Sequence, residues 1–233
     1  MYAQPSLAAR RDPRPLLIVG SDHLANTSTP GGVADPLGVE GVRMSVRRNE
    51  EIFGEGEPAI SVYRVLKGVV RTYRILADGR RQIAEFFLAG DVFGLEESSD
   101  YRTSAEAVCD GEVLAIRKHQ LTERGASNLS TAQKLWALTL HQLRRSEEHM
   151  LVLGRKNACE RLGWFLMDMA ERIPAPDRID LPMSRQDIAD YLGLTIETVS
   201  RTMTTLQDDQ VISLTSSRQV LLRDKHALLD LAA

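Results

Sequence analysis

Four polar side chains recur at spacings of three, one and three residues near the C-terminus: Glu197, Ser200, Arg201 and Thr204. This spacing predicts that they share one face of a helix. An arginine can donate two hydrogen bonds to guanine, a glutamate can accept one from the cytosine amino group, and a serine can contact several bases. The set therefore suits the major groove of DNA. The alternative is a solvated face on which Glu197 and Arg201 form an i,i+4 ion pair.

The residues that precede this face predict a helix-turn-helix. Ser184 and Asp187 form a capping-box-like pair at the start of a first helix, with Asp in place of the usual Glu. Gly193 can take the left-handed conformation that ends this helix. Thr195 can then cap a second helix that runs to about residue 207. Two short helices joined by a turn with a glycine are typical of this motif, which favours base contact for the polar face.

A β-hairpin wing is predicted after the second helix, from the two strand-like runs Val211–Leu214 and Gln219–Leu222. Side chains at the helix starts, on the polar face and at the wing tip are candidates for contact with the DNA backbone. These candidates are Ser184, Arg185, Thr195, Thr198, Thr204 and Arg218. Two of them have simpler alternatives, because Ser184 can be only an N-cap and Arg218 can be only solvated.

A long helical stretch before this motif carries a heptad seam over nearly three repeats. The candidate interface residues in the seam are Trp136, Leu140, Leu143, Glu147 and Met150. The seam predicts a dimer interface, which a charged Glu147 would weaken; the alternative is a core helix packed on the preceding domain. Residues 174–233 hold six Lys and Arg against nine Asp and Glu, so one copy should bind DNA weakly. A dimer on a palindromic site would add two sets of contacts.

Short strand-like segments with regular turns predict an antiparallel β-roll upstream, and Asp78-Gly79 is a hairpin signal within it. The first 40 residues are rich in Pro, Ala and Ser and predict a flexible tail. The expected fold is α+β. Its predicted parts are a flexible N-terminal tail (1–40), a β-roll (41–125), which the family resemblance given below makes like a cyclic-nucleotide-binding domain, a dimerisation helix (126–153) and a winged helix-turn-helix (154–233).

Composition excludes several other classes of protein. The chain has 233 residues, 43% of them hydrophobic, a net charge of −3 and two cysteines. Two cysteines cannot form a disulfide framework or a four-thiolate metal site, and no apolar run is long enough to span a membrane. We expect a cytoplasmic protein without cofactor or metal. Paired carboxylates, a nucleophile elbow and a phosphate loop are missing, so we do not expect an enzyme.

The chain resembles the CRP/FNR superfamily of bacterial transcription regulators over about residues 42–225, and its FixK-like branch in particular. The resemblance rests on the run at 90–94, GDVFG, on the long helix and on the run at 192–201, LGLTIETVSR. It implies that Glu197, Ser200 and Arg201 recognise a TTGA-type half-site and that Ile196 contacts a thymine methyl. It also implies a homodimer that contacts RNA polymerase, mostly as an activator, at low-oxygen or nitrogen-fixation genes.

Two departures limit what the resemblance transfers. Residues 1–40 contain no cysteine for an oxygen-sensing iron–sulfur cluster. Leu95 follows Gly94 where cyclic-AMP-binding relatives have a glutamate, and residues 101–105 match the phosphate element only loosely. An effector-dependent regulator with another small ligand in the roll is the alternative, and a helix-turn-helix that binds protein is a further one. Redox modulation through Cys109 or Cys159 stays open.

Overall fold

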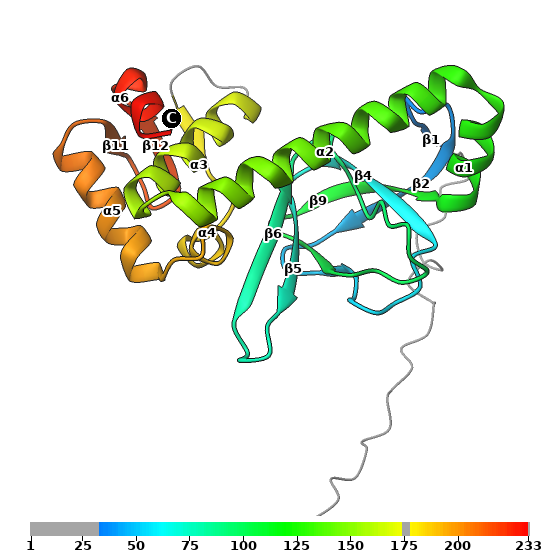
Figure 1. Ribbon diagram of the computed structural model, residues 1–233, viewed down its shortest axis with the longest axis horizontal. Coiled ribbons are helices and arrows are strands. Elements are labelled where there is room, and N and C mark those ends of the chain that lie inside the picture. Colours follow the sequence, from blue (N-terminus) through cyan, green and yellow to red (C-terminus); the bar gives the residue numbers. More distant parts are fainter. Residues whose placement is uncertain (1–32, 174–177, 233) are drawn as a thin grey trace, which may run out of the picture. The chain divides into compact units, whose positions relative to one another are not determined.

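The N-terminal part of the computed structural model, which describes residues 33–173 and 178–232, is an antiparallel β-roll (Figure 1). Its strands are β1 (Val33–Ala34), β2 (Glu40–Val46), β3 (Glu51–Phe53), β4 (Ser61–Lys67), β5 (Val70–Ile75), β6 (Arg81–Phe87), β7 (Val92–Phe93), β8 (Ser104–Ala107) and β9 (Gly111–Arg117). One sheet has the order β1-β2-β9-β4-β7 and the other the order β3-β8-β5-β6. The predicted α+β fold with an antiparallel roll is confirmed.

The hairpin of β5 and β6 forms where Asp78-Gly79 predicts a turn. Ile75 pairs with Arg81, and the amide of Leu76 donates to the carbonyl of Arg80. Gly79 has a φ of +85°, which glycine adopts at no steric cost. This hairpin brings two arginines, Arg71 and Arg81, to one side of the roll.

Helices make up most of the remainder of the chain. They are α1 (Lys118–Ser127), α2 (Leu129–Arg155), α3 (Ala158–Arg172), α4 (Arg185–Leu192), α5 (Ile196–Asp208) and α6 (Lys225–Ala232). Asn128 is extended between α1 and α2, and its side chain accepts a hydrogen bond from the amide of Thr131, so it caps the long helix. No helix in the described ranges is long and apolar enough to cross a membrane.

The wing has one strand more than the sequence predicted. Its strands are β10 (Arg178–Asp180), β11 (Ile212–Leu214) and β12 (Gln219–Leu222), in the order β10-β12-β11. β11 and β12 form the expected hairpin, whereas β10 pairs with β12 from before the helix-turn-helix. A three-residue strand with a single apolar position gives no alternating pattern, which is why the sequence did not reveal it.

The structure differs from the predicted tail over residues 33–40; residues 1–32 of that prediction lie outside the described residues. β1 pairs with the start of β2, and Leu37 is 2% exposed. The buried carboxylate of Asp35 accepts hydrogen bonds from the Leu37 amide and from the Arg64 guanidinium. The contact between Asp35 and Arg64, which are 29 residues apart, holds residues 33–40 on the roll. The sequence of this segment has no helical or strand periodicity that could have predicted this.

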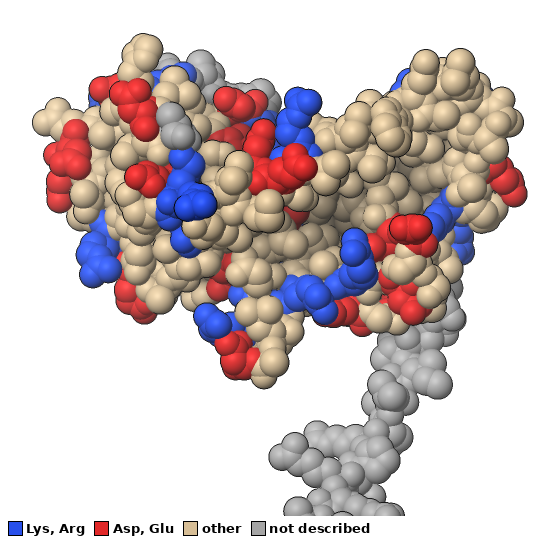
Figure 2. Space-filling model, viewed as in Figure 1, with Lys and Arg blue, Asp and Glu red and all other residues tan. Residues whose placement is uncertain are grey.

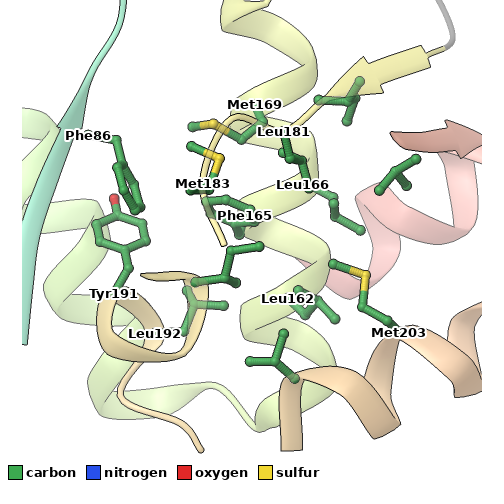
Figure 3. Close-up of a cluster of buried hydrophobic side chains, with 14 of the residues drawn as sticks. Phe86, Leu162, Phe165, Leu166, Met169, Leu181, Met183, Tyr191, Leu192 and Met203 are labelled. Carbon is green, nitrogen blue, oxygen red and sulfur yellow. The ribbon is translucent and has the colours of Figure 1, made fainter. Parts of the chain in front are cut away.

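One hydrophobic core contains residues of both β6 and the C-terminal helices (Figure 3). Phe86 of β6 packs edge-on against Tyr191 of α4, with ring centroids 5.1 Å apart, and against Phe165 of α3 at 6.4 Å. All three rings are fully buried, and each contributes about 2–3 kcal/mol of apolar burial. The first helix of the helix-turn-helix therefore packs directly on a strand of the roll.

Candidate nucleic-acid interface

The helix-turn-helix is formed by α4 and α5, and its turn has the geometry that the sequence predicted. The Ser184 hydroxyl accepts from the Asp187 amide at 3.1 Å, and the Asp187 carboxylate accepts from the Ser184 amide at 2.9 Å. Gly193 ends α4 with a φ of +62°. The Thr195 hydroxyl then accepts from the amide of Thr198 at the start of α5. The capping box, the left-handed glycine and the second cap are all confirmed.

The second helix, α5, has one buried and one exposed face. Val199, Met203 and Leu206 are at most 1% exposed and belong to the core, in which Figure 3 shows Met203. The polar residues singled out above lie on the opposite, exposed face: Glu197, Ser200, Arg201 and Thr204. In the described part of the chain, Glu197 and Arg201 do not form an ion pair with each other. The carboxylate and the guanidinium therefore do not occupy each other's hydrogen-bonding positions.

Glu197 is charged at neutral pH. Hydrogen bonds from its own backbone amide at the start of α5 and from the Thr195 hydroxyl lower the pKa of its carboxyl below the usual value. An ionised carboxylate is only an acceptor, whereas the guanidinium of Arg201 is only a donor. The face therefore offers an acceptor and a donor one helical turn apart, which is the pattern needed to contact the edges of a C·G pair and a nearby guanine. Ile196, 37% exposed, adds an apolar group beside them.

The candidates for backbone contact lie around this face. Arg185 is the first residue of α4 and is half-buried, and its Nη1 atom has no hydrogen-bond partner among the described residues. Burial lowers the pKa of Arg185 because no carboxylate compensates it. The hydroxyls of Thr195 and Thr198 lie 3.1 Å apart, and that of Thr204 donates to the Ser200 carbonyl. Arg218 is half-buried in the turn of the wing.

The heptad seam of α2 is exposed. Trp136 is 67% exposed, Leu143 53% and Met150 65%, while Leu140 and Glu147 are exposed on the same stripe. The second apolar stripe of α2, with Leu135 and Leu138, packs instead against the roll. The second stripe of α2 thus packs on the roll, as the alternative interpretation predicts, whereas the seam is not covered by the described residues of this chain and its role as a dimer interface stays a prediction.

His149, on a different face of α2 from the seam, is buried against α4. It is 7% exposed and its Nε2 lies 2.9 Å from the Tyr191 carbonyl. Its ring stacks on that of Tyr191 at 4.0 Å. Burial lowers the pKa of His149, so the neutral form is favoured. The histidine thus links α2 to the end of α4, a contact across 42 residues that no local pattern reveals.

Acidic residues of α4 pair with arginines of the roll, which the sequence analysis missed. Asp187 accepts from Arg71 at 2.9 Å and from Arg81 at 2.6 Å, and Asp190 accepts from Arg81 at 2.8 Å. We call these four residues the α4 ion-pair cluster. Burial raises the pKa of Asp187, but the Ser184 hydrogen bonds and the two guanidinium charges outweigh it, and the pKa lies below its usual value. The pairs span more than a hundred residues, so only the fold brings them together.

The interior of the roll is filled with aromatic side chains. Phe53 stacks on Tyr101 with ring centroids 3.7 Å apart, and Tyr63 stacks on Phe93 at 5.2 Å. Arg102, in the segment that loosely resembles a phosphate element, is exposed and pairs with Glu96 at 2.9 Å. The arginine is thus already neutralised by a neighbour six residues away.

A cavity of about 230 Å³ lies between β6, the following turn and α2. Its lining includes Arg145 and Arg172, but both are engaged in ion pairs: Arg145 with Glu85 and Asp168, and Arg172 with Asp168 and Asp91. The volume is below the usual range of about 300–1,000 Å³ for ligand pockets. These features do not favour a ligand in the roll.

Both cysteines are free and half-buried. Cys159 lies in α3 and packs against the core, and burial raises the pKa of its thiol, which disfavours the reactive thiolate. Cys109 lies between β8 and β9 and lines an open groove near the wing.

Basic and acidic side chains alternate over the visible surface instead of forming one broad basic patch (Figure 2). Arg81 and Arg145 are moreover engaged in ion pairs with carboxylates. This distribution agrees with the charge count, from which we predict weak phosphate neutralisation by a single copy.

Comparison with known proteins agrees with this geometry. Residues 160–231 match the Crp-like helix-turn-helix domain, and residues 43–128 match the cyclic nucleotide-binding domain. The chain is 48% identical over 207 residues to the nitrogen fixation regulation protein FixK of Azorhizobium caulinodans, covering 87% of this chain and 82% of the relative. It is 40% identical to FixK of Rhizobium meliloti, covering 83% and 89%. The solved structure of FixK2 from Bradyrhizobium japonicum has a TM-score of 0.80 and 46% identity, covering 83% of this chain and 98% of that one.

Proposed function

Because the chain belongs to the FixK-like branch of the CRP/FNR superfamily of bacterial transcription regulators, we propose that it acts as a homodimeric activator on palindromic DNA sites. Regulation of transcription through DNA binding is common to this family. The half-site that we propose is of the TTGA type. The observation that carries this proposal is the exposed face of α5, where the ionised carboxylate of Glu197 lies one turn from the guanidinium of Arg201, which has no ion-pair partner among the described residues.

We assign the base contacts as follows. Arg201 donates to guanine O6 and N7, Glu197 accepts from the amino group of a cytosine on the complementary strand, and Ser200 adds a contact to a neighbouring base. Ile196 contacts a thymine methyl. The exposed or half-buried hydroxyls and arginines around the face contact phosphates and fix its position: Ser184, Arg185, Thr195, Thr198, Thr204 and Arg218.

The base assignment is tested by substituting protein and DNA together. Arg201→Ala should weaken binding to the palindrome by about 1–3 kcal/mol per half-site and should remove the preference for guanine at one position only. Arg223→Ala is the control, because it removes one positive charge from an exposed position outside α5. An Arg201→Ala protein that still prefers guanine as strongly as the wild type would refute the assignment and favour a helix-turn-helix that binds protein.

The dimer is supported by the exposed seam on α2. A row of apolar side chains at heptad spacing loses its contact with water when a second copy covers it. Two copies also double the phosphate contacts that one weakly basic domain can make. Sedimentation of the purified protein tests this, since Trp136→Ala, Leu140→Ala and Leu143→Ala should raise the dimer dissociation constant while leaving the monomer folded.

The family resemblance implies recruitment of RNA polymerase, and the names of the relatives indicate the genes controlled. The relatives named above are described as regulators of nitrogen fixation, and they are regulators rather than enzymes. We therefore propose a non-enzymatic activator of low-oxygen or nitrogen-fixation genes in the bacterial cytoplasm. A purified transcription assay tests it: the protein should raise transcript yield from a promoter with the palindrome and not from one with a scrambled site.

We propose that no effector is required. The aromatic interior of the roll and the paired arginines of its small cavity support this over an effector-dependent regulator. Sequence-specific binding by purified protein without any additive is the expected result. Specific binding that appears only after a cell extract of small molecules is added would support the alternative.

A further inference from the structure

The first helix of the helix-turn-helix is attached to the roll by charges as well as by apolar packing. Arg71 of β5 is 5% exposed, and Arg81 of β6 is paired with two carboxylates of α4. On the other side, Asp187 is 4% exposed and receives both guanidinium groups on a single oxygen, Oδ1. Its second oxygen, Oδ2, accepts from the amide and hydroxyl of Ser184. The carboxylate of Asp187 therefore both caps α4 and binds the two arginines of the roll.

Further polar contacts hold Arg71 and the end of α4 in place. Arg71 also donates to Asn49 at 3.2 Å and pairs with Glu106 at 3.0 Å. These two contacts within the roll hold the Arg71 side chain in place independently of α4. At the other end of α4, the Tyr191 carbonyl accepts from Gln82 of β6 at 3.3 Å. The roll thus contacts α4 at its first and last turns. Two attachment points along a helix fix both its tilt and its rotation.

Buried ion pairs contribute little net stability, because desolvation offsets most of the attraction. Their geometry is directional, however, and apolar packing is not. The rings of Phe86 and Tyr191 would tolerate a small rotation of α4 on β6, whereas two guanidinium groups that meet Asp187 and Asp190 would not. The α4 ion-pair cluster is therefore better suited to set an orientation than to stabilise the fold.

The orientation of α4 determines that of α5. The turn between them is short, and Ala189 and Val199 are completely buried where the two helices pack. A palindromic site requires two recognition helices about 34–36 Å apart, in successive major grooves on one side of the duplex. Each α5 must therefore have one fixed direction relative to the rest of its own chain.

We propose that Arg71 and Arg81 are positioning residues for DNA recognition: through Asp187 and Asp190 they set the direction of α5 and so determine which half-site spacing the dimer accepts. This inference rests on the proposed function. The two arginines are placed in β5 and β6, far from α5 in sequence, and neither is among the residues that contact DNA in the assignment above. Their effect should be seen in spacing preference and not in base preference.

The test uses the full-length protein and three fluorescent duplexes. One has two TTGA-type half-sites at the normal separation, the second has one base pair inserted between them, and the third is scrambled. One inserted base pair turns one half-site by about 35° relative to the other. Wild-type protein should bind the first duplex at least about tenfold more tightly than the second, and both more tightly than the third.

Arg81→Met is the main variant, because Arg81 is 23% exposed in its side chain and its removal leaves Asp187 paired with Arg71. Its affinity for the normally spaced duplex should fall about tenfold, as expected for loss of charge-assisted hydrogen bonds, while its affinity for the inserted duplex changes less. Arg74→Met is the matched control. It removes an arginine of the same hairpin that pairs with Glu55 and is 60% exposed, and it should keep the wild-type preference.

Asp190→Asn is a second variant for the case in which Arg81→Met does not unfold cooperatively in urea. It leaves Arg81 paired with Asp187 and should reduce the spacing preference in the same direction by a smaller factor. A folded Arg81→Met or Asp190→Asn protein with the wild-type spacing preference would overturn the inference and leave the proposed function intact. A wild-type protein that does not prefer the palindrome to the scrambled duplex would refute both.

Discussion

Replacing Asp187 by Asn should destabilise the protein far more than its small change in shape suggests. The carboxylate is 4% exposed and accepts from two guanidinium groups and from Ser184. An amide has only one oxygen, so its NH₂ group must face either the arginines or the Ser184 amide, and both are donors. Breaking a buried ion pair costs about 3–5 kcal/mol. In the Asp187→Asn protein, Arg71 is still paired with Glu106 and Arg81 is still paired with Asp190. We therefore expect the free energy of unfolding to fall by about 3 kcal/mol, the lower end of that range.

The assay is urea unfolding followed by circular dichroism, at several pH values. The pKa of Asp187 is lower in the folded protein than its ordinary value. Its contribution is therefore complete above the unfolded pKa of about 4 and is lost as the pH falls through the lower, folded pKa. The stability difference between wild type and Asp187→Asn should be constant from pH 7 to about pH 5 and should shrink below about pH 4.

Asp180→Asn is the control, because it removes a carboxylate whose pair with Arg178 is exposed on both sides. Its urea midpoint should match that of the wild type at pH 7. An Asp187→Asn protein that loses less than about 1 kcal/mol at pH 7 would refute the role assigned to this carboxylate. A difference that stays the same at pH 3 would refute its ionic origin.

Three other substitutions test the turn of the helix-turn-helix, the proposed dimer seam and the pKa of Glu197, in that order. Gly193→Ala should cost about 1–2 kcal/mol in urea unfolding, because a Cβ there meets no atom closer than 3.5 Å and only the left-handed backbone is penalised; Gly154→Ala in α2, with open space and no positive φ, should not destabilise. Glu147→Leu should lower the dimer dissociation constant at least about tenfold in sedimentation, because in the proposed dimer it removes a charge that would face its own copy across the seam; an unchanged constant would place Glu147 outside the interface. Thr195→Ala should raise the pKa of Glu197 measured by NMR toward its usual value, since one of its hydrogen bonds is lost; an unchanged pKa would mean that the Thr195 hydroxyl does not act on this carboxylate.

Features that depend on neighbours along the chain could be predicted from the sequence. The capping box at Ser184, the left-handed Gly193 and the cap at Thr195 involve residues at most four apart, and each residue type has a strong conformational preference. The exposed face of α5 followed from the helical period alone. The hairpin at Asp78-Gly79 was predicted for the same reason.

Features that depend on the fold could not be predicted. Arg71 meets Asp187 across 116 residues, and nothing near either residue indicates the partner. The burial of His149 could not be predicted, because the heptad pattern assigns the faces of a helix but does not say which of them the roll and α4 cover. β10 was missed because a three-residue strand shows no period. The residues that contact DNA remain predictions, as does the dimer interface on α2.

The central claim is that this chain recognises a palindrome by itself, through α5 and without an effector. The most direct measurement is fluorescence anisotropy of purified protein with a TTGA-type palindromic duplex and with a scrambled duplex, at about 150 mM salt and with no added ligand. We expect a preference of about 10³-fold or more for the palindrome. Equal, weak binding to both duplexes would contradict it.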